Sequence, residues 1–158
     1  MCHLPWKITR VLLLGLLGVA SGYAYPDRNQ EIFSMRRNQM IETQLKGRGI
    51  KDKRVLEAMQ HLPRHLFMPK EIKEAAYEDR PLPIGHFQTI SQPYIVAYMT
   101  EALQLQATDT VLEIGTGSGY QAALLGWLVD DVYSVEIIPD LAHSAQRLLE
   151  RLALDNVQ

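Results

Sequence analysis

Hydrophobic residues recur at close to helical spacing in the first half of the chain. The apolar positions of Gln30–Lys46 predict one amphipathic helix, with Gly47 and Gly49 ending the pattern. The residues expected on its buried face are Ile32, Met35, Met40, Ile41 and Leu45.

A second helix is expected directly after Asp52, whose carboxylate can accept from the free amides of the first turn. Pro63 interrupts this helix. One face of it carries Val55, Leu56 and Met59. The connector that follows leads to a third, shorter helix predicted over Pro69–Ala76.

The segment Tyr77–Pro93 has no sustained periodicity and contains three prolines and one glycine, so we expect an ordered loop. Ser91 is expected to cap a helix that begins near Pro93, because proline is tolerated in the first helical turn. The predicted buried face of this helix comprises Ile95, Val96, Met99 and Leu103.

From Thr108 onward the pattern alternates between strand and helix. A nearly continuous apolar run at 110–115 predicts a buried strand, residues 132–136 predict a second, and helices are expected at 120–129 and 139–154. The later helix turns inward Leu141, Ala145, Leu148, Leu149 and Leu152. This order predicts an α/β fold with a parallel sheet, in which Asn156–Gln158 approaches a third strand.

Composition places the chain among soluble globular proteins, with 158 residues, 47% hydrophobic and 22% charged. The formal charge of −2 provides no broad positive field, so general binding to nucleic acid is not expected. Cys2 is the only cysteine, which excludes a disulfide framework and a multi-cysteine metal site. His61 and His65 are four apart without further ligands, and we assign no metal.

Residues 1–24 have the pattern of a signal peptide. Lys7 and Arg10 precede the apolar run Val11–Ala20, and small Gly22 and Ala24 follow where a signal peptidase cleaves. The run is short for a bilayer of about 30 Å, which argues against a permanent membrane anchor, with an uncleaved short anchor as the alternative. Export to the periplasm or medium is expected.

The glycines at 115, 117 and 119 follow the first predicted strand and precede a helix. A dinucleotide-binding fingerprint starting at Gly115 and Gly117 needs a third glycine where Tyr120 stands, so an NAD-dependent dehydrogenase is disfavoured. No lysine followed by serine or threonine succeeds the loop, which excludes a phosphate-binding P-loop.

Two acids accompany this loop. Glu113 lies at the end of the first strand and Glu136 at the end of the second, and both strand ends open on one crevice in such a sheet. Glu136 is at the distance along the chain where a carboxylate binds ribose hydroxyls, and Glu113 favours a cationic ligand. S-adenosylmethionine combines a ribose with an ammonium and a sulfonium. A nucleoside ligand of this kind is therefore predicted. The alternative interpretation is that residues 115–119 form only a tight turn, with Glu113 and Glu136 solvated.

Two stretches resemble known families. VLEIGTGSGY, residues 111–120, resembles the first motif of class I S-adenosylmethionine-dependent methyltransferases. PLPIGHFQTISQPYIVAYMTEAL, residues 81–103, resembles the amino-terminal substrate loop of protein-L-isoaspartate O-methyltransferases, and similarity extends over about Met40–Gln158. The resemblance implies a Rossmann-like class I methyltransferase sheet, here incomplete, with an amino-terminal helical extension.

The resemblance also implies an activity. Members of this family transfer a methyl group from S-adenosylmethionine to the free α-carboxylate of isoaspartyl residues in damaged proteins, and the ester then closes to a succinimide. The implied partners are isoaspartyl-containing proteins and peptides. A monomer is expected, and the family resemblance makes a cytoplasmic location the alternative to export.

Site roles follow from the same resemblance. Ser91 and Thr89 are expected to be catalytic, with the Ser91 hydroxyl orienting the acceptor carboxylate, although a plain helix cap is the alternative role for Ser91. His86 and Phe87 stand where the family more often has glutamine or glycine, and His86 as a general base is disfavoured. The expected cofactor contacts are Gln88, Thr89, Ile90, Ser91, Glu113, Gly115, Gly117, Ser118, Gly119 and Glu136.

Later family segments do not occur: a Gly-Asp-Gly near the adenine, a Pro-Phe-Asp strand and a Lys-Pro-Gly-Gly turn. We therefore expect a truncated enzyme with weak or absent cofactor binding, organised as a leader (1–24), a helical and substrate-loop region (25–107) and the first part of the cofactor-binding domain (108–158). The other interpretations are a methyltransferase with a different acceptor and a non-catalytic remnant.

Overall fold

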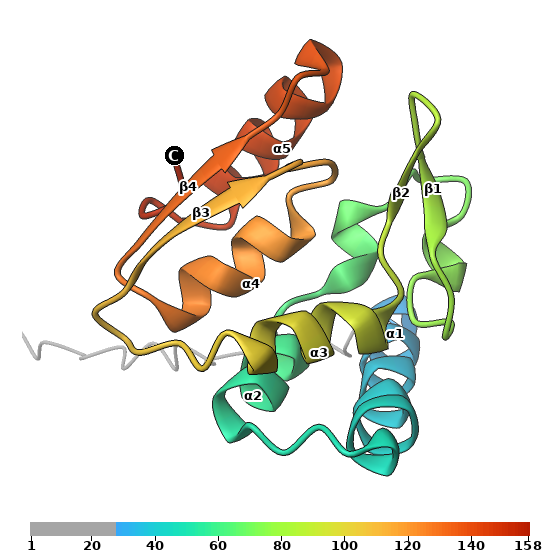
Figure 1. Cartoon of the computed structure of the whole chain (residues 1–158). Coiled ribbons are helices and arrows are strands. Elements are labelled where there is room, and N and C mark those ends of the chain that lie inside the picture. Colours follow the sequence, from blue (N-terminus) through green and yellow to red (C-terminus); the bar gives the residue numbers. More distant parts are fainter. Residues whose placement is uncertain (1–27) are drawn as a thin grey trace, which may run out of the picture.

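A computed structural model describes residues 28–158, shown in Figure 1, and the predicted leader at 1–24 lies outside them. Helix α1 (Arg28–Gln39) continues into a π-helical turn at Met40–Leu45 and a 3-10 turn at Lys46–Arg48. Gly49 ends the run with a left-handed φ of 97°. The first predicted helical segment is confirmed, but Met35 is 63% exposed and Phe33 is buried in its place.

Helix α2 (Lys53–His61) begins as predicted at Asp52, whose carboxylate accepts from the backbone N–H of Arg54 at 2.8 Å and of Val55 at 3.3 Å. Such a cap stabilises a helix by about 1 kcal/mol. The predicted helix over Pro69–Ala76 is wrong, because only a 3-10 turn at Lys73–Ala75 forms there. Its amides bond three residues back, and a segment this short does not sustain an α-helix.

The expected loop before α3 instead contains a β-hairpin. Strand β1 (Leu82–Gly85) pairs antiparallel with β2 (Gln88–Ile90). The turn residues His86 and Phe87 have φ values of 50° and 56°. Hairpin turns with two left-handed residues are usually signalled by Asn-Gly, so this turn lacks the sequence signal that predicts it.

Helix α3 (Pro93–Ala102) forms where predicted but turns a different face inward. Its buried residues pack toward α2 and the π-helical turn. Of the predicted face only Val96 is buried, while Ile95, Met99 and Leu103 are 39%, 44% and 55% exposed. The buried positions keep helical spacing and are Pro93, Val96, Ala97 and Thr100.

The second half is the predicted α/β unit. Strand β3 (Thr110–Ile114), helix α4 (Tyr120–Leu128), strand β4 (Asp131–Val135) and helix α5 (Pro139–Arg151) follow in order. The strands pair in parallel, from Thr110 with Asp131 to Ile114 with Val135. Val157 forms a parallel bridge with Val132, as expected for the approach to a third strand. Figure 1 shows this pair of strands set apart from the β1–β2 hairpin.

One face of the β3–β4 pair is covered and the other is open. Val132 and four of the predicted inner residues of the last helical segment are buried, namely Leu141, Ala145, Leu148 and Leu149, while the fifth, Leu152, is half-buried. On the other face Leu112 and Ile114 are 64% and 75% exposed. Val111 and Glu113 on the covered face are only half-buried, so the prediction of a buried strand at 110–115 is wrong. Strand residues alternate between faces, and elements of 28–158 pack against only one of them. None of the helices in this range is long and apolar enough to cross a membrane.

Candidate active site

The glycine loop joins β3 to α4, and each glycine in it has its own reason. Gly115 has a φ of 96°, and a Cβ there would meet nothing within 4 Å. A Cβ on Gly117 would lie 3.3 Å from the Ile84 side chain, and one on Gly119 would lie 3.1 Å from Cβ of Ala145. The lack of a side chain at Gly117 therefore lets the hairpin approach the loop, and the lack of one at Gly119 lets α5 approach it. The space next to Gly115 is open.

Glu136 follows β4 and binds the loop directly. Its Oε2 accepts from the Gly117 N–H at 2.8 Å, and its Oε1 accepts from the Ile138 N–H at 2.9 Å. Partial burial raises the pKa of Glu136, but hydrogen bonds from the backbone of Ile138, Gly117 and Ile137 outweigh this and hold the pKa below its ordinary value. A charged carboxylate thus stands beside the loop.

Glu113 occupies the end of β3, half-buried beneath the same loop. Its carboxylate accepts from the Ser134 hydroxyl, which also pairs with Thr116 Oγ1 at 2.6 Å. Burial raises the pKa of Glu113 to about 7, the Ser134 hydrogen bond opposes this, and the charge of Glu136 raises it further. Glu113 is therefore poised to ionise when a cation arrives.

A pocket of about 270 Å³ lies between the glycine loop, the end of β2 and the start of α3. Seven of the ten predicted site residues line it: Thr89, Ile90, Ser91, Glu113, Gly115, Gly117 and Ser118. Val96, Met99 and Tyr120 complete much of its wall. The segment 89–91 and the glycine loop, which belong to two separate sequence motifs, thus meet in one cavity.

Three predicted site residues lie outside the wall of this pocket. Gln88 is exposed beside the hairpin turn. Gly119 is buried against α5, and Glu136 reaches the pocket only through its bond to Gly117. Glu136 instead lines a neighbouring cavity of about 550 Å³ with Thr116 and Ser134. The two cavities share the glycine loop as their wall.

Ser91 does not cap α3, because Gln92 holds the cap position and no side chain bonds the first turn. The Ser91 side chain is exposed on the pocket wall, and the hydrogen bonds of residues 28–158 include none from its hydroxyl. Its backbone carbonyl, by contrast, accepts from Nη2 of Arg64 at 2.6 Å. The hydroxyl is available to a ligand while the backbone is held.

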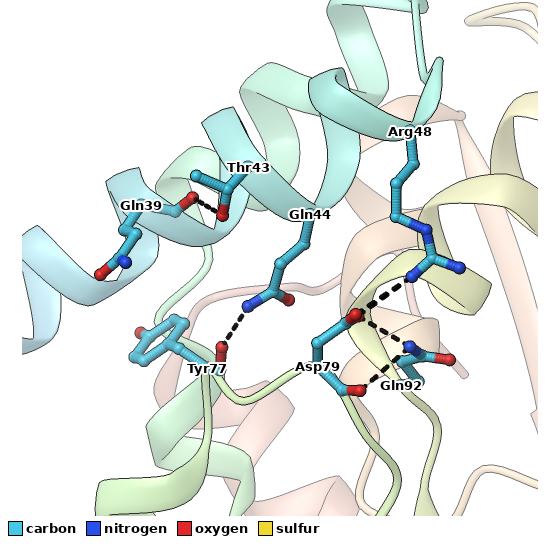
Figure 2. A network of polar contacts seen from close by, with 7 residues as sticks. All are labelled: Gln39, Thr43, Gln44, Arg48, Tyr77, Asp79 and Gln92. Carbon is cyan, nitrogen blue, oxygen red and sulfur yellow. Dashed lines mark hydrogen bonds and ion pairs between the residues drawn. The ribbon is translucent and has the colours of Figure 1, made fainter.

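A polar network, drawn in Figure 2, supports the same segment from the solvent side. Asp79 Oδ1 accepts from Gln92 Nε2 at 2.7 Å, and its Oδ2 pairs with Arg48 at 3.2 Å. The Arg48 guanidinium also lies 3.7 Å from the ring centre of Tyr94. Gln44, in the π-helical turn, donates to the carbonyl of Tyr77 at 2.9 Å. This network was not predicted, since its members are spread over three separate segments.

The two histidines considered as ligands lie in separate aromatic stacks. His61 stacks on Trp127 at a centroid distance of 5.3 Å, and His65 stacks on Phe33 at 4.0 Å. His65 also bonds the Tyr77 hydroxyl through Nδ1 at 2.9 Å. Residues 28–158 contain no cluster of three or more His, Cys, Asp or Glu side chains arranged to hold a metal ion.

Residues 35–158 match the protein-L-isoaspartate(D-aspartate) O-methyltransferase family. The chain belongs to this family. Protein-L-isoaspartate O-methyltransferase 1 of Syntrophobacter fumaroxidans is 56% identical over 125 residues, covering 79% of this chain and 58% of the relative. The Myxococcus xanthus enzyme is 62% identical over 113 residues, covering 72% of this chain and 53% of the relative. The chain thus spans somewhat more than half the length of these relatives.

Solved structures of the family confirm the predicted fold class. One protein-L-isoaspartate O-methyltransferase superposes with a TM-score of 0.70 at 32% identity, covering 77% of this chain and 40% of that one. The family member from Plasmodium falciparum, solved in complex with S-adenosyl-L-homocysteine, gives a TM-score of 0.64 at 28% identity, covering 77% of this chain and 60% of that one. The family and fold suggested by the two motifs are therefore correct.

Proposed function

We propose that these residues serve methyl transfer from S-adenosylmethionine to the α-carboxylate of isoaspartyl residues in damaged proteins. One observation carries the proposal: Ser91, which follows the hairpin, lines the same pocket as Glu113 and Gly115 of the glycine-loop segment. The names of the relatives agree with this activity, and one structural neighbour was solved with the demethylated cofactor. Isoaspartyl-containing proteins and peptides are the proposed partners.

The residues fit the cofactor on physical grounds. S-adenosylmethionine supplies an electrophilic methyl group on a sulfonium. Open space over Gly115 lets a ligand approach the backbone, and ionised Glu113 complements a positive charge. The charged Glu136 carboxylate beside Gly117 supplies an acceptor for ribose hydroxyls.

The chemistry asks little of an acid or base. The acceptor is already a carboxylate anion and the donor already a cation, so the chain must exclude water and hold the two in line. The Ser91 hydroxyl suits this task because no intramolecular bond occupies it in the described chain. Thr89, on the same pocket wall, is proposed to support it.

A labelled-methyl assay tests the proposal. The 158-residue chain is incubated with S-adenosylmethionine carrying a labelled methyl group and with two peptides, one containing isoaspartate and its twin containing normal aspartate. We expect base-labile label on the isoaspartyl peptide alone. Equal or greater labelling of the twin favours another acceptor, and labelled product from neither peptide by a folded chain favours a non-catalytic remnant.

Calorimetry tests cofactor affinity separately. We expect weak binding, because one face of the β3–β4 pair is open in the described residues. Two strands provide limited support for a rigid site. Micromolar affinity for S-adenosylmethionine would contradict this expectation.

We further propose that residues 1–24 direct export and are then removed. We also propose that the chain is a monomer. The support is sequence alone: Lys7 and Arg10 before the apolar run Val11–Ala20. Cell fractionation followed by amino-terminal sequencing tests this, with Tyr25 expected as the first mature residue. Cytoplasmic recovery with an intact leader contradicts export, and light scattering reports the oligomeric state.

A further inference from the structure

Arg64 is a buried cation without a carboxylate partner. Its side chain is 0% exposed, and no ion pair within residues 28–158 includes it. Arginine stays charged inside proteins, and a buried charge without a counter-ion is costly. Because Arg64 forms no ion pair in this range, its burial must be explained by its other contacts.

The guanidinium contacts identify what it serves. Its Nε donates to the Ala76 carbonyl at 2.7 Å and its Nη2 to the Ser91 carbonyl at 2.6 Å, while Nη1 is buried with no partner. The guanidinium carbon Cζ lies 4.9 Å from the ring centre of Tyr120, and both Tyr120 and Ser91 line the pocket. Arg64 therefore contacts two residues of the pocket wall, Ser91 through its backbone carbonyl and Tyr120 through its ring.

The pocket thus has an acidic group on its wall and a buried positive charge behind Ser91. Glu113 provides negative charge near the glycine loop when it is ionised, and Arg64 provides positive charge behind Ser91. The first suits a cationic donor and the second an anionic acceptor. Weakly screened charges act over several ångströms in a partly buried site, so Arg64 need not touch the acceptor.

We propose that Arg64 is a positioning residue for the acceptor: it fixes the Ser91 backbone and its unpaired charge favours a carboxylate in front of Ser91. This inference rests on the proposed function, since it assigns the acceptor side of that site. It predicts discrimination between an isoaspartyl peptide with a free α-carboxylate and the same peptide carrying a neutral carboxamide.

The experiment measures binding of these two peptides to the full chain by fluorescence anisotropy, without cofactor. The wild type is expected to bind the carboxylate peptide about tenfold more tightly than the carboxamide. In Arg64→Met this preference disappears, and in Arg64→Lys, which keeps the charge, most of it remains. Arg36→Met is the matched control, because it makes the same replacement at an exposed arginine that pairs with Glu74 and does not line the pocket.

A purely structural role for Arg64 predicts a different pattern. Removal of the side chain also frees the Ala76 and Ser91 carbonyls, so Arg64→Met can fail to fold, and Arg64→Gln then replaces it as a neutral variant with a donor. Loss of affinity for both peptides in equal measure in the neutral variant overturns the proposal, as does a wild type with no preference or no binding.

Hydrogen exchange gives an independent measurement. Faster exchange of residues 88–95 in the variants, with α5 unchanged, is expected if Arg64 fixes the Ser91 segment. A uniform increase over the whole chain, or no increase at all, contradicts it. Failure of the methylation assay with the anion preference intact rejects the proposed function and leaves the role of Arg64 standing.

Discussion

The Glu136 carboxylate accepts from the Gly117 N–H at 2.8 Å, which ties the end of β4 to the glycine loop. The other carboxylate oxygen bonds the Ile138 N–H, so a single side chain orders the loop on one side and the entry to α5 on the other. The loop geometry is thus held by the protein itself, and the residue proposed to bind ribose also shapes the pocket.

Glu136→Gln is expected to lower both the stability of the chain and its affinity for the cofactor. The amide replaces one acceptor oxygen with a donor that faces a backbone N–H, and loss of a charge-assisted hydrogen bond costs about 1–2 kcal/mol of unfolding free energy. Urea denaturation measures this loss, and calorimetry measures weaker binding of S-adenosylhomocysteine. Unchanged stability would show that the loop does not depend on this contact.

Glu113→Gln is expected to change stability and cofactor binding in opposite directions. Burial raises the pKa of Glu113 to about 7, above the ordinary 4.5, so the unfolded state ionises first and wild-type stability falls as pH rises from 4.5 to 7. Removing the charge is expected to stabilise the chain by about 2 kcal/mol above pH 7, after allowance for solvent screening, and by nothing below pH 4.5.

The matching measurement for Glu113 is a series of denaturation curves across this pH range, beside cofactor binding at pH 8. The neutral variant should bind the cationic cofactor more weakly, because the opposing charge is gone. A variant that is less stable than wild type at pH 8 would mean that the Ser134 hydrogen bond outweighs burial.

The glycines of the loop predict a contrast between two substitutions. Gly119→Ala places a Cβ 3.1 Å from Ala145 and keeps a φ of 82°, so we expect a stability loss of about 2–3 kcal/mol from crowding and backbone strain. Gly115→Ala meets no atom within 4 Å and should lose about 1 kcal/mol from its φ of 96° alone. Thermal unfolding compares the two.

Binding should separate these glycine variants further. Gly115 lines the pocket and Gly119 does not, so the Gly115→Ala methyl group obstructs the ligand although the protein is the more stable of the pair. Calorimetry with S-adenosylhomocysteine checks this. If Gly119→Ala, measured on its folded fraction, loses more affinity than Gly115→Ala, the assignment of open space over Gly115 to the ligand is wrong.

The sequence predicted the parts of the fold that depend on local signals. Asp52 caps α2 as expected because one side chain and two nearby amides decide it. The face of α3 was wrong because its environment comes from α2 and the π-helical turn, which the periodicity of Ile95 and Met99 does not encode. The hairpin was missed because His86 and Phe87 occupy left-handed positions that normally hold asparagine or glycine.

The candidate site also contains residues that the sequence predicts and residues that it does not. The glycines, acids and serine of the candidate site were predicted from motifs, because these residue types stand at a spacing that the sequence itself displays. Arg64 was missed because an arginine in a connector is usually a solvated side chain, and only the tertiary structure shows that it is buried against Ser91. Residues that support a site from a distance have no local signature.

Asp79→Asn tests the network on the solvent side of Ser91. The side chains of Arg48 and Asp79 are each 42% exposed, so the stability change should stay within about 0.5 kcal/mol. The Gln92 side chain loses one strong acceptor, and we expect the KM for an isoaspartyl peptide to rise a few-fold with cofactor binding unchanged. Glu78→Gln is the control, since it breaks an ion pair with Arg80 that does not involve Gln92.

His65 predicts how the chain responds to acid. Burial, then the charges of Arg37 and Lys73, lower the pKa of His65 to about 4 from 6.5. The unfolded state therefore takes up a proton before the native state does, and stability should fall as pH decreases from 6.5 to 4. His65→Gln removes this titration, so its stability should depend less on pH in that window. His61→Gln, at an exposed histidine stacked on Trp127, is the control for replacement of a histidine by glutamine. Equal slopes for His65→Gln and wild type would show that other groups govern acid unfolding.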